Sequence, residues 1–503
     1  MSDAPLILGV SGLRGIVGES LTPEVAVRYA GAFGTWLQER IEDRQPYVLV
    51  ARDGRAGDEA IYTAVISGLL ATGCRVRRLN VAMTPTVGMQ CDFVRADAAM
   101  IVTASHNPQE WNGVKMLVRQ ASWTGPGADG RGIVEQSRSD ACAPGSAMAA
   151  EIVERFNEGR VDWWSGPDCE NTTVDEDVDD PHCLRVLDAC GKAMGAEDHF
   201  FWEWFGERLS PRVVADSVNA SGAWPVRVFF EGTPCQFINL HGGSSGVFPH
   251  TPEPTRENLS GEGGLCDAVP GLKADVGFAQ DPDADRLAIV DELGNYIGEE
   301  YTLVLCAAAL MEGRKERGAT GDAKPVFVVN LSTSRMIDDV AAHYGAEVER
   351  TAVGEANVVE RMKALTAAGR DVVMGGEGNG GVIWPRVVHV RDSLVGMALV
   401  LEMLAMVGRP LGEIVDGMPS YAIVKQKLDL TPENASIPGR LVEVLPAHFP
   451  GRAIDVQDGV RIDWPDRWVH VRASNTEPIL RLIAEGPTEA DCLAVLQEVR
   501  GAL

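Results

Sequence analysis

The sequence predicts an α/β fold in which three related mixed α/β domains, with mainly parallel sheets, precede a smaller α+β domain at the C-terminus. Three observations lead to this prediction. The length of 503 residues corresponds to about three to four domains at roughly 150 residues each. Strand-like and helix-like segments alternate over most of the chain, which is typical of βαβ units and parallel sheets. The segment from residue 414 onward departs from that alternation.

The first block shows the alternation most clearly. Thr22 precedes Pro23 and Glu24, which is typical of a helix N-terminus because it offers a cap, an N1 proline and an acidic first turn. This helix is expected to continue to about Arg40. Gly73 ends a second helix, as glycine after the last periodic residue commonly does. The other predicted elements of this block are strands at 47–51, 75–79 and 98–103 and a helix at 61–70.

The same alternation returns in the middle of the chain. Short apolar runs predict strands, and longer runs bounded by capping residues predict helices. Gly408 and Pro410 supply the stop signal of the last helix. The predicted strands are 212–215, 274–279, 287–290, 326–330 and 371–374, and the predicted helices are 224–230, 300–312, 332–344 and 393–407.

The C-terminal segment has strand-like runs at 422–428, 468–472 and 479–483 and a final helix from Glu489, which indicates a small α+β module. We therefore expect four domains. Their bounds are 1–177, with an acidic insertion near 160–200, then 178–258, 259–413 with the third α/β block, and 414–503.

The charge of the chain limits its partners. It has 45 basic and 72 acidic residues, a net charge of −27. A broad basic face for nucleic acid or an anionic membrane is not expected, although a small basic pocket for an anionic metabolite is compatible with this balance.

No apolar run approaches the roughly 20 residues of a membrane span, and no signal peptide is visible. The ten cysteines contain no C-x-x-C pair, so neither a zinc site nor a disulfide framework is indicated. We expect a cytoplasmic protein.

The segment TASHNP (103–108) directly follows a predicted apolar strand. In open α/β folds, ligands bind at the carboxyl ends of parallel strands. Asn107 and Pro108 favour an extended turn, so Ser105 is expected on a rigid loop. A nucleophilic or phosphate-carrying serine and an ordinary polar turn both remain open at this point. The segment is not a G-x-S-x-G elbow, so an esterase triad has no local support.

The segment QDPDADR (280–286) contains three alternating aspartates. In an extended segment, Asp281, Asp283 and Asp285 project to the same side. Carboxylates this close repel one another unless a cation neutralises them, and hard oxygen ligands select Mg²⁺. An EF-hand does not fit, because Arg286 stands where that loop needs glycine. The alternative is a solvated acidic turn, but apolar strands on both sides favour a Mg²⁺ site.

Two further loops could contact a substrate. GGEGNGG (375–381) is rich in glycine, which allows a ligand to approach the backbone, while Glu377 and Asn379 could hydrogen-bond sugar hydroxyls. It is not a G-x-G-x-x-G helix start, which disfavours a dinucleotide site. In RASNTEP (472–478), Arg472 offers a fork for phosphate, although an ordinary hairpin loop remains the alternative.

Together, and in this order, the four segments resemble the α-D-phosphohexomutase superfamily. TASHNP is similar to its active-site serine loop, DPDADR to its metal loop, GEGNGG to its sugar-recognition loop and RASNTEP to its phosphate-binding loop. The segment GVSGLRGIVGESLTPE (9–24) also resembles the N-terminal segment of that family. The resemblance covers nearly the whole chain. It implies four domains around a central cleft, the last with a TATA-box-binding-protein-like fold.

The resemblance implies an isomerase that moves phosphate between the 1- and 6-positions of a hexose or hexosamine phosphate. It implies a phosphoserine enzyme and a hexose 1,6-bisphosphate that serves as intermediate and activator. The expected partner is a small sugar phosphate, and the expected assembly is a monomer or homodimer. By matching position, the resemblance implies phosphoserine at Ser105; Mg²⁺ on that serine and on Asp281, Asp283 and Asp285; proton transfer by Lys115; Arg14, His106 and Arg286 beside the reaction centre; sugar contacts from Glu377 and Asn379; and phosphate contacts from Arg472, Ser474, Asn475 and Thr476.

Two departures from the family pattern concern the sugar. The chain has Gly-Asn-Gly-Gly where many phosphomannomutase and phosphoglucomutase members carry Ser-Gly-His, and Glu355 where many carry histidine. The EGNGGVIWP form is closer to phosphoglucosamine mutase-like members with a GxNGG loop. Phosphoglucosamine mutase activity is therefore favoured, and phosphomannomutase or phosphoglucomutase activity is the alternative.

Two rival classes remain. A metal-dependent phosphomonoesterase would use the same serine but would not need a separate phosphate loop. A non-catalytic sugar-phosphate-binding protein would have no need for Ser105, Lys115 and the three aspartates, all of which are present.

Overall fold

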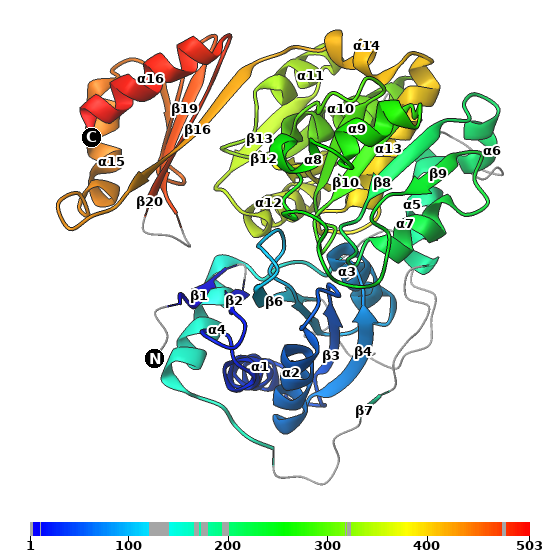
Figure 1. Cartoon of the computed structure of the whole chain (residues 1–503). Coiled ribbons are helices and arrows are strands. Elements are labelled where there is room, and N and C mark those ends of the chain that lie inside the picture. Colours follow the sequence, from blue (N-terminus) through cyan, green and yellow to red (C-terminus); the bar gives the residue numbers. More distant parts are fainter. Residues whose placement is uncertain are drawn as a thin grey trace.

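The structure is a computed structural model that describes residues 4–10, 12–119, 140–164, 171–172, 180–193, 201–316, 318, 323–474 and 479–503. In these residues four β-sheets follow one another along the chain, each with helices packed against it (Figure 1). Three sheets mix parallel and antiparallel pairs, and the fourth is antiparallel. The predicted fold class is therefore confirmed.

The N-terminal sheet, at the bottom of Figure 1, has seven strands. Its elements are β1 (Ile7–Gly9), β2 (Gly12–Ile16), α1 (Pro23–Gln38), β3 (Tyr47–Arg52), α2 (Glu59–Ala71), β4 (Arg75–Val81), α3 (Thr84–Phe93), β5 (Ala98–Val102), β6 (Trp111–Val118), α4 (Ser146–Glu158) and β7 (Asn171–Thr172). The strand order is β1-β2-β6-β5-β3-β4-β7, with β3 parallel to β4 and β5. The predicted start of α1 is confirmed, since the Val25 N–H donates to Thr22 Oγ1 over 3.3 Å.

The second sheet has four strands in the order β11-β10-β8-β9. Its block contains α5 (Asp180–Ala193), α6 (Phe201–Gly206), β8 (Arg212–Asp216), α7 (Ala223–Phe230), β9 (Gln236–Asn239), α8 (Arg256–Leu259), α9 (Leu265–Gly271), β10 (Val276–Gln280) and β11 (Leu287–Asp291). β8 is parallel to both β9 and β10, and β10 is antiparallel to β11. Most of the acidic run 170–181 lies outside the described residues.

This topology corrects one expected boundary. The aspartate loop joins β10 to β11, so it belongs to the second sheet and not to the third domain, 259–413, where we expected it. The physical reason is strand pairing: Phe278 of β10 lies opposite Ala215 of β8 in a parallel ladder. Alternation along the chain shows that a strand exists, but not which earlier strand it pairs with.

The third sheet has the order β13-β12-β14-β15. Its block contains α10 (Glu299–Glu316), β12 (Pro325–Asn330), α11 (Met336–Tyr344), β13 (Glu347–Thr351), α12 (Glu355–Ala367), β14 (Asp371–Glu377), β15 (Gly381–Ile383), α13 (Ser393–Val407) and α14 (Leu411–Asp416). The predicted bounds of α13 are confirmed, and its residues from Ser393 to Ala405 are buried on every side.

Three predicted bounds in this block differ from the structure by three residues or more. The first is the end of helix α10, which lies at Glu316 and not at 312. Helix α11 begins at Met336 and not at 332, because the Asn330 carboxamide oxygen accepts the Ser332 N–H over 2.8 Å and the Thr333 hydroxyl over 3.1 Å, which holds a turn. Strand β14 continues to Glu377, so the predicted glycine loop is shorter than expected. Glu377 therefore stands on a strand end that pairs with Gly381.

The C-terminal sheet is antiparallel, in the order β16-β20-β19-β18-β17, and lies to one side of the other blocks (Figure 1). Its elements are β16 (Ala422–Asp429), α15 (Ile437–His448), β17 (Ala453–Asp455), β18 (Val460–Asp463), β19 (Trp468–Ala473), β20 (Ile479–Gly486) and α16 (Glu489–Ala502). Leu441, Leu445 and Leu496 from its helices pack against this sheet. Across the described ranges, the structure contains no helix with the length and apolar character that crossing a membrane requires.

Candidate active site

Ser105 lies on the turn that follows β5 and is almost fully buried. Its φ of 52° lies in the left-handed region, which is unusual for a residue other than glycine. The turn is held from both sides: the Ser105 N–H donates to Thr103 Oγ1 over 2.8 Å, and its carbonyl accepts from Arg55 Nη2 over 2.7 Å. Arg55 is itself buried and paired with Asp53 at 2.9 Å. The serine is therefore presented on a rigid loop.

The aspartate loop faces this serine. Ser105 Oγ donates to Asp281 Oδ2 over 2.8 Å, and the Arg286 N–H donates to Asp281 Oδ1 over 3.1 Å. Lys115, on β6, binds both Asp283 and Asp285, the latter at 2.8 Å. The structure thus brings Ser105, Lys115 and the three aspartates together, as the resemblance implies.

The three carboxylates are fully buried and offer oxygens within 4.8 Å of one another. Burial, together with Asp285 and Asp283, raises the pKa of Asp281 well above its ordinary value. Although burial acts in the opposite direction, Arg391, Lys115 and Arg286 lower the pKa of Asp285. Oδ1 of Asp283 and Oδ1 of Asp285 have no hydrogen-bond partner among the described residues. Buried, unpartnered carboxylate oxygens that converge in this way fit a hard cation such as Mg²⁺.

Arg391 is a central residue of the site that the motifs did not reveal. Its guanidinium pairs with Asp285 at 2.6 Å, Glu377 at 2.8 Å and Glu355 at 3.2 Å. It therefore links the aspartate loop to the glycine-rich loop. Glu355, which stands where many family members carry histidine, is committed to this arginine, and burial raises its pKa.

The glycine-rich loop presents two different side chains. Glu377 is fully engaged, since Oε1 accepts from Asn330 Nδ2 over 2.9 Å and Oε2 from Arg391. In contrast, Oδ1 of Asn379 is buried and has no hydrogen-bond donor within the described part of the chain. The side chain that remains available for a ligand is therefore Asn379 rather than Glu377.

Arg14 and His106 both lie next to the serine turn. Arg14 Nη1 donates to Asn107 Oδ1 over 3.0 Å, and His106 Nδ1 stands 3.4 Å from Ser105 Oγ. The positive charge of Arg286 and burial lower the pKa of His106 well below its ordinary value, so this ring is neutral near pH 7.

The predicted phosphate loop is described only in part. Arg472, on β19, pairs with Asp458 at 3.6 Å, and its Nε is buried without a partner among the described residues. Ser474 is described, whereas Asn475 and Thr476 lie outside the described residues. The Nε–H of Arg472 therefore has no acceptor among the described residues and can donate to a ligand.

A cavity of about 460 Å³ connects these groups. Residues of all four blocks line it: Arg14, Lys115, Arg286, Glu355, Glu377, Asn379, Arg391, Gln457 and Asp458. Ser105 and Arg472 are not part of this lining. Ser105 bonds to Asp281, whose loop also carries Asp285, the partner of the lining residue Lys115. Arg472 pairs with the lining residue Asp458. Four cationic side chains in one cavity suit an anionic ligand, although the chain as a whole is strongly acidic.

The four-block architecture places a buried serine that faces carboxylates beside a cationic cavity. Family models named phosphoglucomutase/phosphomannomutase match in four parts: α/β/α domain I over residues 5–133, domain II over 205–294, domain III over 299–421 and the C-terminal domain over 432–502. The chain belongs to this family of isomerases.

Relatives and solved structures agree. A phosphoglucomutase/phosphomannomutase of Thermococcus kodakarensis is 33% identical over 96% of this chain and 95% of its own. A probable phosphoglucosamine mutase of Methanopyrus kandleri is also 33% identical, over 96% and 94%. The crystal structure of a phosphoglucomutase/phosphomannomutase family protein from Burkholderia thailandensis shares the fold, with a TM-score of 0.75, 24% identity and coverage of 99% and 98%.

Proposed function

We propose that this mutase interconverts the 1- and 6-phosphates of a hexosamine, with glucosamine phosphate as the favoured substrate and mannose or glucose phosphate as the alternative. The observation that carries the proposal is the hydrogen bond from Ser105 Oγ to Asp281 in the aspartate loop. A serine held against buried carboxylates is suited to carry phosphate only where cations neutralise the added charge, and Lys115 and Arg286 lie there.

In the proposed reaction, phosphate on Ser105 passes to the free hydroxyl of the bound sugar phosphate. The Oγ–P bond breaks and a sugar O–P bond forms, while the hydroxyl gives up one proton and Ser105 regains one. The resulting 1,6-bisphosphate turns over, and its other phosphate returns to Ser105. Lys115 is the group to exchange the proton: burial lowers its pKa, but Asp283 and Asp285 outweigh this and raise it, so it holds a proton in this state.

Asp281, Asp283 and Asp285 would hold Mg²⁺, together with an oxygen of the phosphorylated serine. When bound, the ion supplies positive charge to the transferred phosphoryl oxygens. The chain's own contribution is positional. Thr84 Oγ1 donates to Asp283 Oδ2 over 2.7 Å, and the turn around Ser105 is fixed by Arg55, so both loops are ordered.

The phosphate at the non-reacting end is assigned to Arg472 with Ser474, Asn475 and Thr476. An arginine fork recognises phosphate oxygens and is insensitive to ring stereochemistry, which suits a sugar that must bind in two orientations. Sugar choice is assigned to Asn379, because its unpartnered carboxamide oxygen can accept a hydrogen bond from an ammonium or hydroxyl group. The name phosphoglucosamine mutase, carried by several relatives, supports the amino sugar, and the Asn379 acceptor is compatible with it.

The experiment is a substrate panel. The protein is given glucosamine, glucose, mannose and N-acetylglucosamine 1-phosphates with Mg²⁺ and a trace of the matching 1,6-bisphosphate, and phosphorus NMR follows the products. We expect 6-phosphate without release of free phosphate, fastest for glucosamine. Stoichiometric free phosphate would instead identify a phosphomonoesterase, and binding without turnover would identify a non-catalytic protein.

A further inference from the structure

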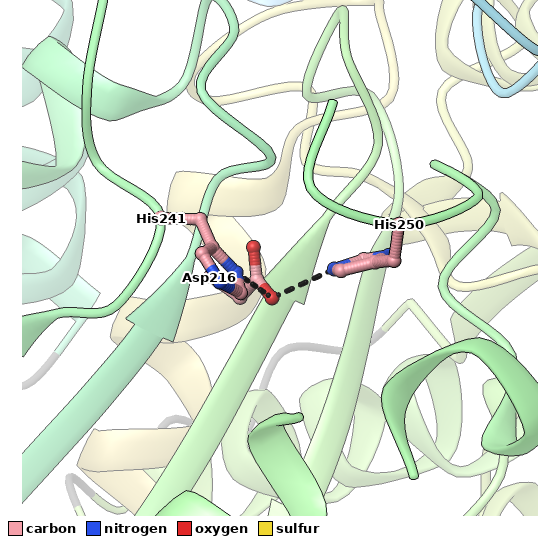
Figure 2. A group of neighbouring side chains, drawn as sticks. All are labelled: Asp216, His241 and His250. Atoms are coloured by element: carbon pink, nitrogen blue, oxygen red, sulfur yellow. Dashed lines mark hydrogen bonds and ion pairs between the residues drawn. The ribbon is translucent and has the colours of Figure 1, made fainter. Parts of the chain in front are cut away.

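A second cluster of metal-ligating side chains lies on the same sheet as the aspartate loop, but on other residues. Asp216 ends β8, His241 follows β9, and His250 lies on the connection that leads to α8 (Figure 2). Because β8 and β9 are parallel neighbours, their carboxyl ends bring Asp216 and His241 together. Their nitrogen and oxygen donors all fall within 4.8 Å of one another.

Both imidazoles point at one carboxylate oxygen. His241 Nδ1 stands 2.8 Å and His250 Nε2 2.9 Å from Asp216 Oδ2, from opposite sides of the carboxylate (Figure 2). The other oxygen of Asp216 accepts the Val218 N–H over 3.0 Å, which orients the carboxylate. Asp216 is fully buried, whereas the two rings are 24% and 18% exposed, so an ion could reach them from solvent.

The tautomer of His250 determines which of its ring nitrogens can bind an ion. Its Nδ1 lies 2.8 Å from the Thr251 carbonyl, which can only accept, so Nδ1 carries a hydrogen. In the neutral ring, Nε2 then presents a lone pair to Asp216 Oδ2, which also presents a lone pair. These two atoms need a cation between them, either a proton or a metal ion. A metal-bound histidine typically donates its other ring N–H to a carbonyl or carboxylate in this way.

We propose that Asp216, His241 and His250 bind a divalent transition-metal ion, with Zn²⁺ as the best fit. Zinc–ligand distances of about 2.0–2.2 Å at tetrahedral angles place two ligands of one ion about 3.3–3.6 Å apart. The nitrogens at 2.8 and 2.9 Å from Asp216 Oδ2 would therefore move apart by about half an ångström to admit an ion. Two imidazoles with one carboxylate select zinc-like ions over Mg²⁺, which prefers an all-oxygen set. The absence of a C-x-x-C pair does not argue against this site, because its ligands are histidine and aspartate and not cysteine.

The ion would join three segments that are separate in sequence. The connection that carries His250 also contacts the serine loop: Gln109 Nε2 donates to the Gly246 carbonyl over 3.1 Å, and the Phe248 N–H donates to Gln109 Oε1 over 2.9 Å. The site therefore fixes the support of the serine loop without contributing a group to the reaction. This inference goes beyond the proposed function and does not depend on which sugar is the substrate.

The test uses the full chain. Protein stripped with a chelator is supplied with excess Mg²⁺ to occupy the aspartate loop, and Zn²⁺ is then titrated in competition with a chromophoric chelator. We expect wild type to bind one Zn²⁺ per chain, and the double variant His241→Ala/His250→Ala to bind it at least about tenfold more weakly. The matched control is His343→Ala, which removes an exposed histidine of α11 and should leave affinity unchanged.

A second measurement does not depend on how any variant folds. X-ray absorption of the wild type at one equivalent of Zn²⁺ should show two imidazole ligands. If the variant His241→Ala/His250→Ala unfolds, the variant His241→Gln/His250→Gln replaces it, and circular dichroism checks that it is folded. Equal Zn²⁺ affinity in wild type and folded double variant, or an oxygen-only ligand shell, would overturn the proposal; the cluster would then be a carboxylate bridged by protonated imidazoles.

Discussion

Ser105 Oγ and Asp281 Oδ2 are joined by a hydrogen bond of 2.8 Å, although the two residues are 176 positions apart in sequence. The bond connects the first sheet to the second, since Ser105 follows β5 and Asp281 follows β10. Thr84 makes a second connection between the two sheets, because its N–H donates to the Asp283 carbonyl over 3.0 Å. The serine loop and the aspartate loop are therefore joined directly by their own residues.

Ser105→Ala should abolish mutase turnover and leave the fold intact. The hydroxyl donates to Asp281 and also lies 3.4 Å from His106 Nδ1; loss of the bond to Asp281 costs about 1 kcal/mol of stability. Intact-mass spectrometry after incubation with a hexose 1,6-bisphosphate should show an added phosphate on wild type and none on the variant. The control is Ser146→Ala, which removes another serine beside the cavity. This variant should gain the same added phosphate as wild type. Turnover in Ser105→Ala would contradict the phosphoserine mechanism.

Asp283→Asn should lower kcat by at least about a hundredfold, because neutralising transferred phosphoryl oxygens is worth several kcal/mol. Mg²⁺ should raise the melting temperature of wild type but not of the variant, since an ion that binds only the folded state stabilises it. Asp267→Asn, at an exposed aspartate of α9, is the control. Full activity after exhaustive chelation would count against the site.

Arg391→Ala should destabilise the protein strongly. Glu355 and Glu377 would lose their shared cation while staying buried, a change that typically costs about 3–5 kcal/mol. Urea unfolding measures it. Glu355→Gln alone should cost much less, and adding it to Arg391→Ala should recover part of the loss, because one unpaired charge is removed. Strictly additive effects would show that the two side chains do not interact.

Arg472→Ala should weaken binding of every sugar phosphate by a similar factor, about 1.5–3 kcal/mol for a charge-assisted contact. Asn379→Ala should instead change the ranking of sugars and affect the amino sugar most. Titration calorimetry with the panel of sugar phosphates separates the two effects, with Arg467→Ala as the control at an arginine paired with Asp466. A changed ranking with unchanged overall affinity in Arg472→Ala would refute this division of roles.

Glu300→Gln should flatten the pH dependence of stability. Glu300 accepts the Ser334 N–H over 3.3 Å beside Lys425, and burial raises its pKa to about 8 from an ordinary 4.5. The folded chain therefore binds a proton more tightly than the unfolded chain. The resulting stabilisation is complete below pH 4.5 and is lost as the pH rises towards 8. Melting temperatures across that range should fall for wild type and less steeply for the variant. Parallel curves would exclude Glu300 as the cause.

Local signals predicted those parts of the fold that depend on neighbouring residues. The start of α1 followed from Thr22 and Pro23, and the end of α13 from Gly408 and Pro410. The sheet to which β10 belongs could not be predicted, because it depends on pairing with β8 some sixty residues earlier. Helix α15 was also missed, as its apolar pattern is interrupted by Pro438 and Pro446.

The candidate site likewise combines residues that local motifs predicted with residues that they did not. Four motifs indicated the serine, aspartate, glycine-rich and phosphate loops. Arg391, Thr84 and Arg55 were not expected, because an arginine or threonine gives no signal until the groups within its reach are known. The contrast between an engaged Glu377 and an available Asn379 likewise requires hydrogen-bond partners, which one sequence does not contain.

The cavity lining has a consequence for how the protein becomes active during synthesis. Domains fold largely in the order in which they leave the ribosome. Ser105 and the aspartates emerge with the first two sheets, whereas Gln457 and Asp458, which complete the lining, belong to the last. A nascent chain can therefore bring Ser105 and the aspartates together before the lining of the cavity is complete. Co-translational folding thus completes the cavity only after the C-terminal sheet has been made.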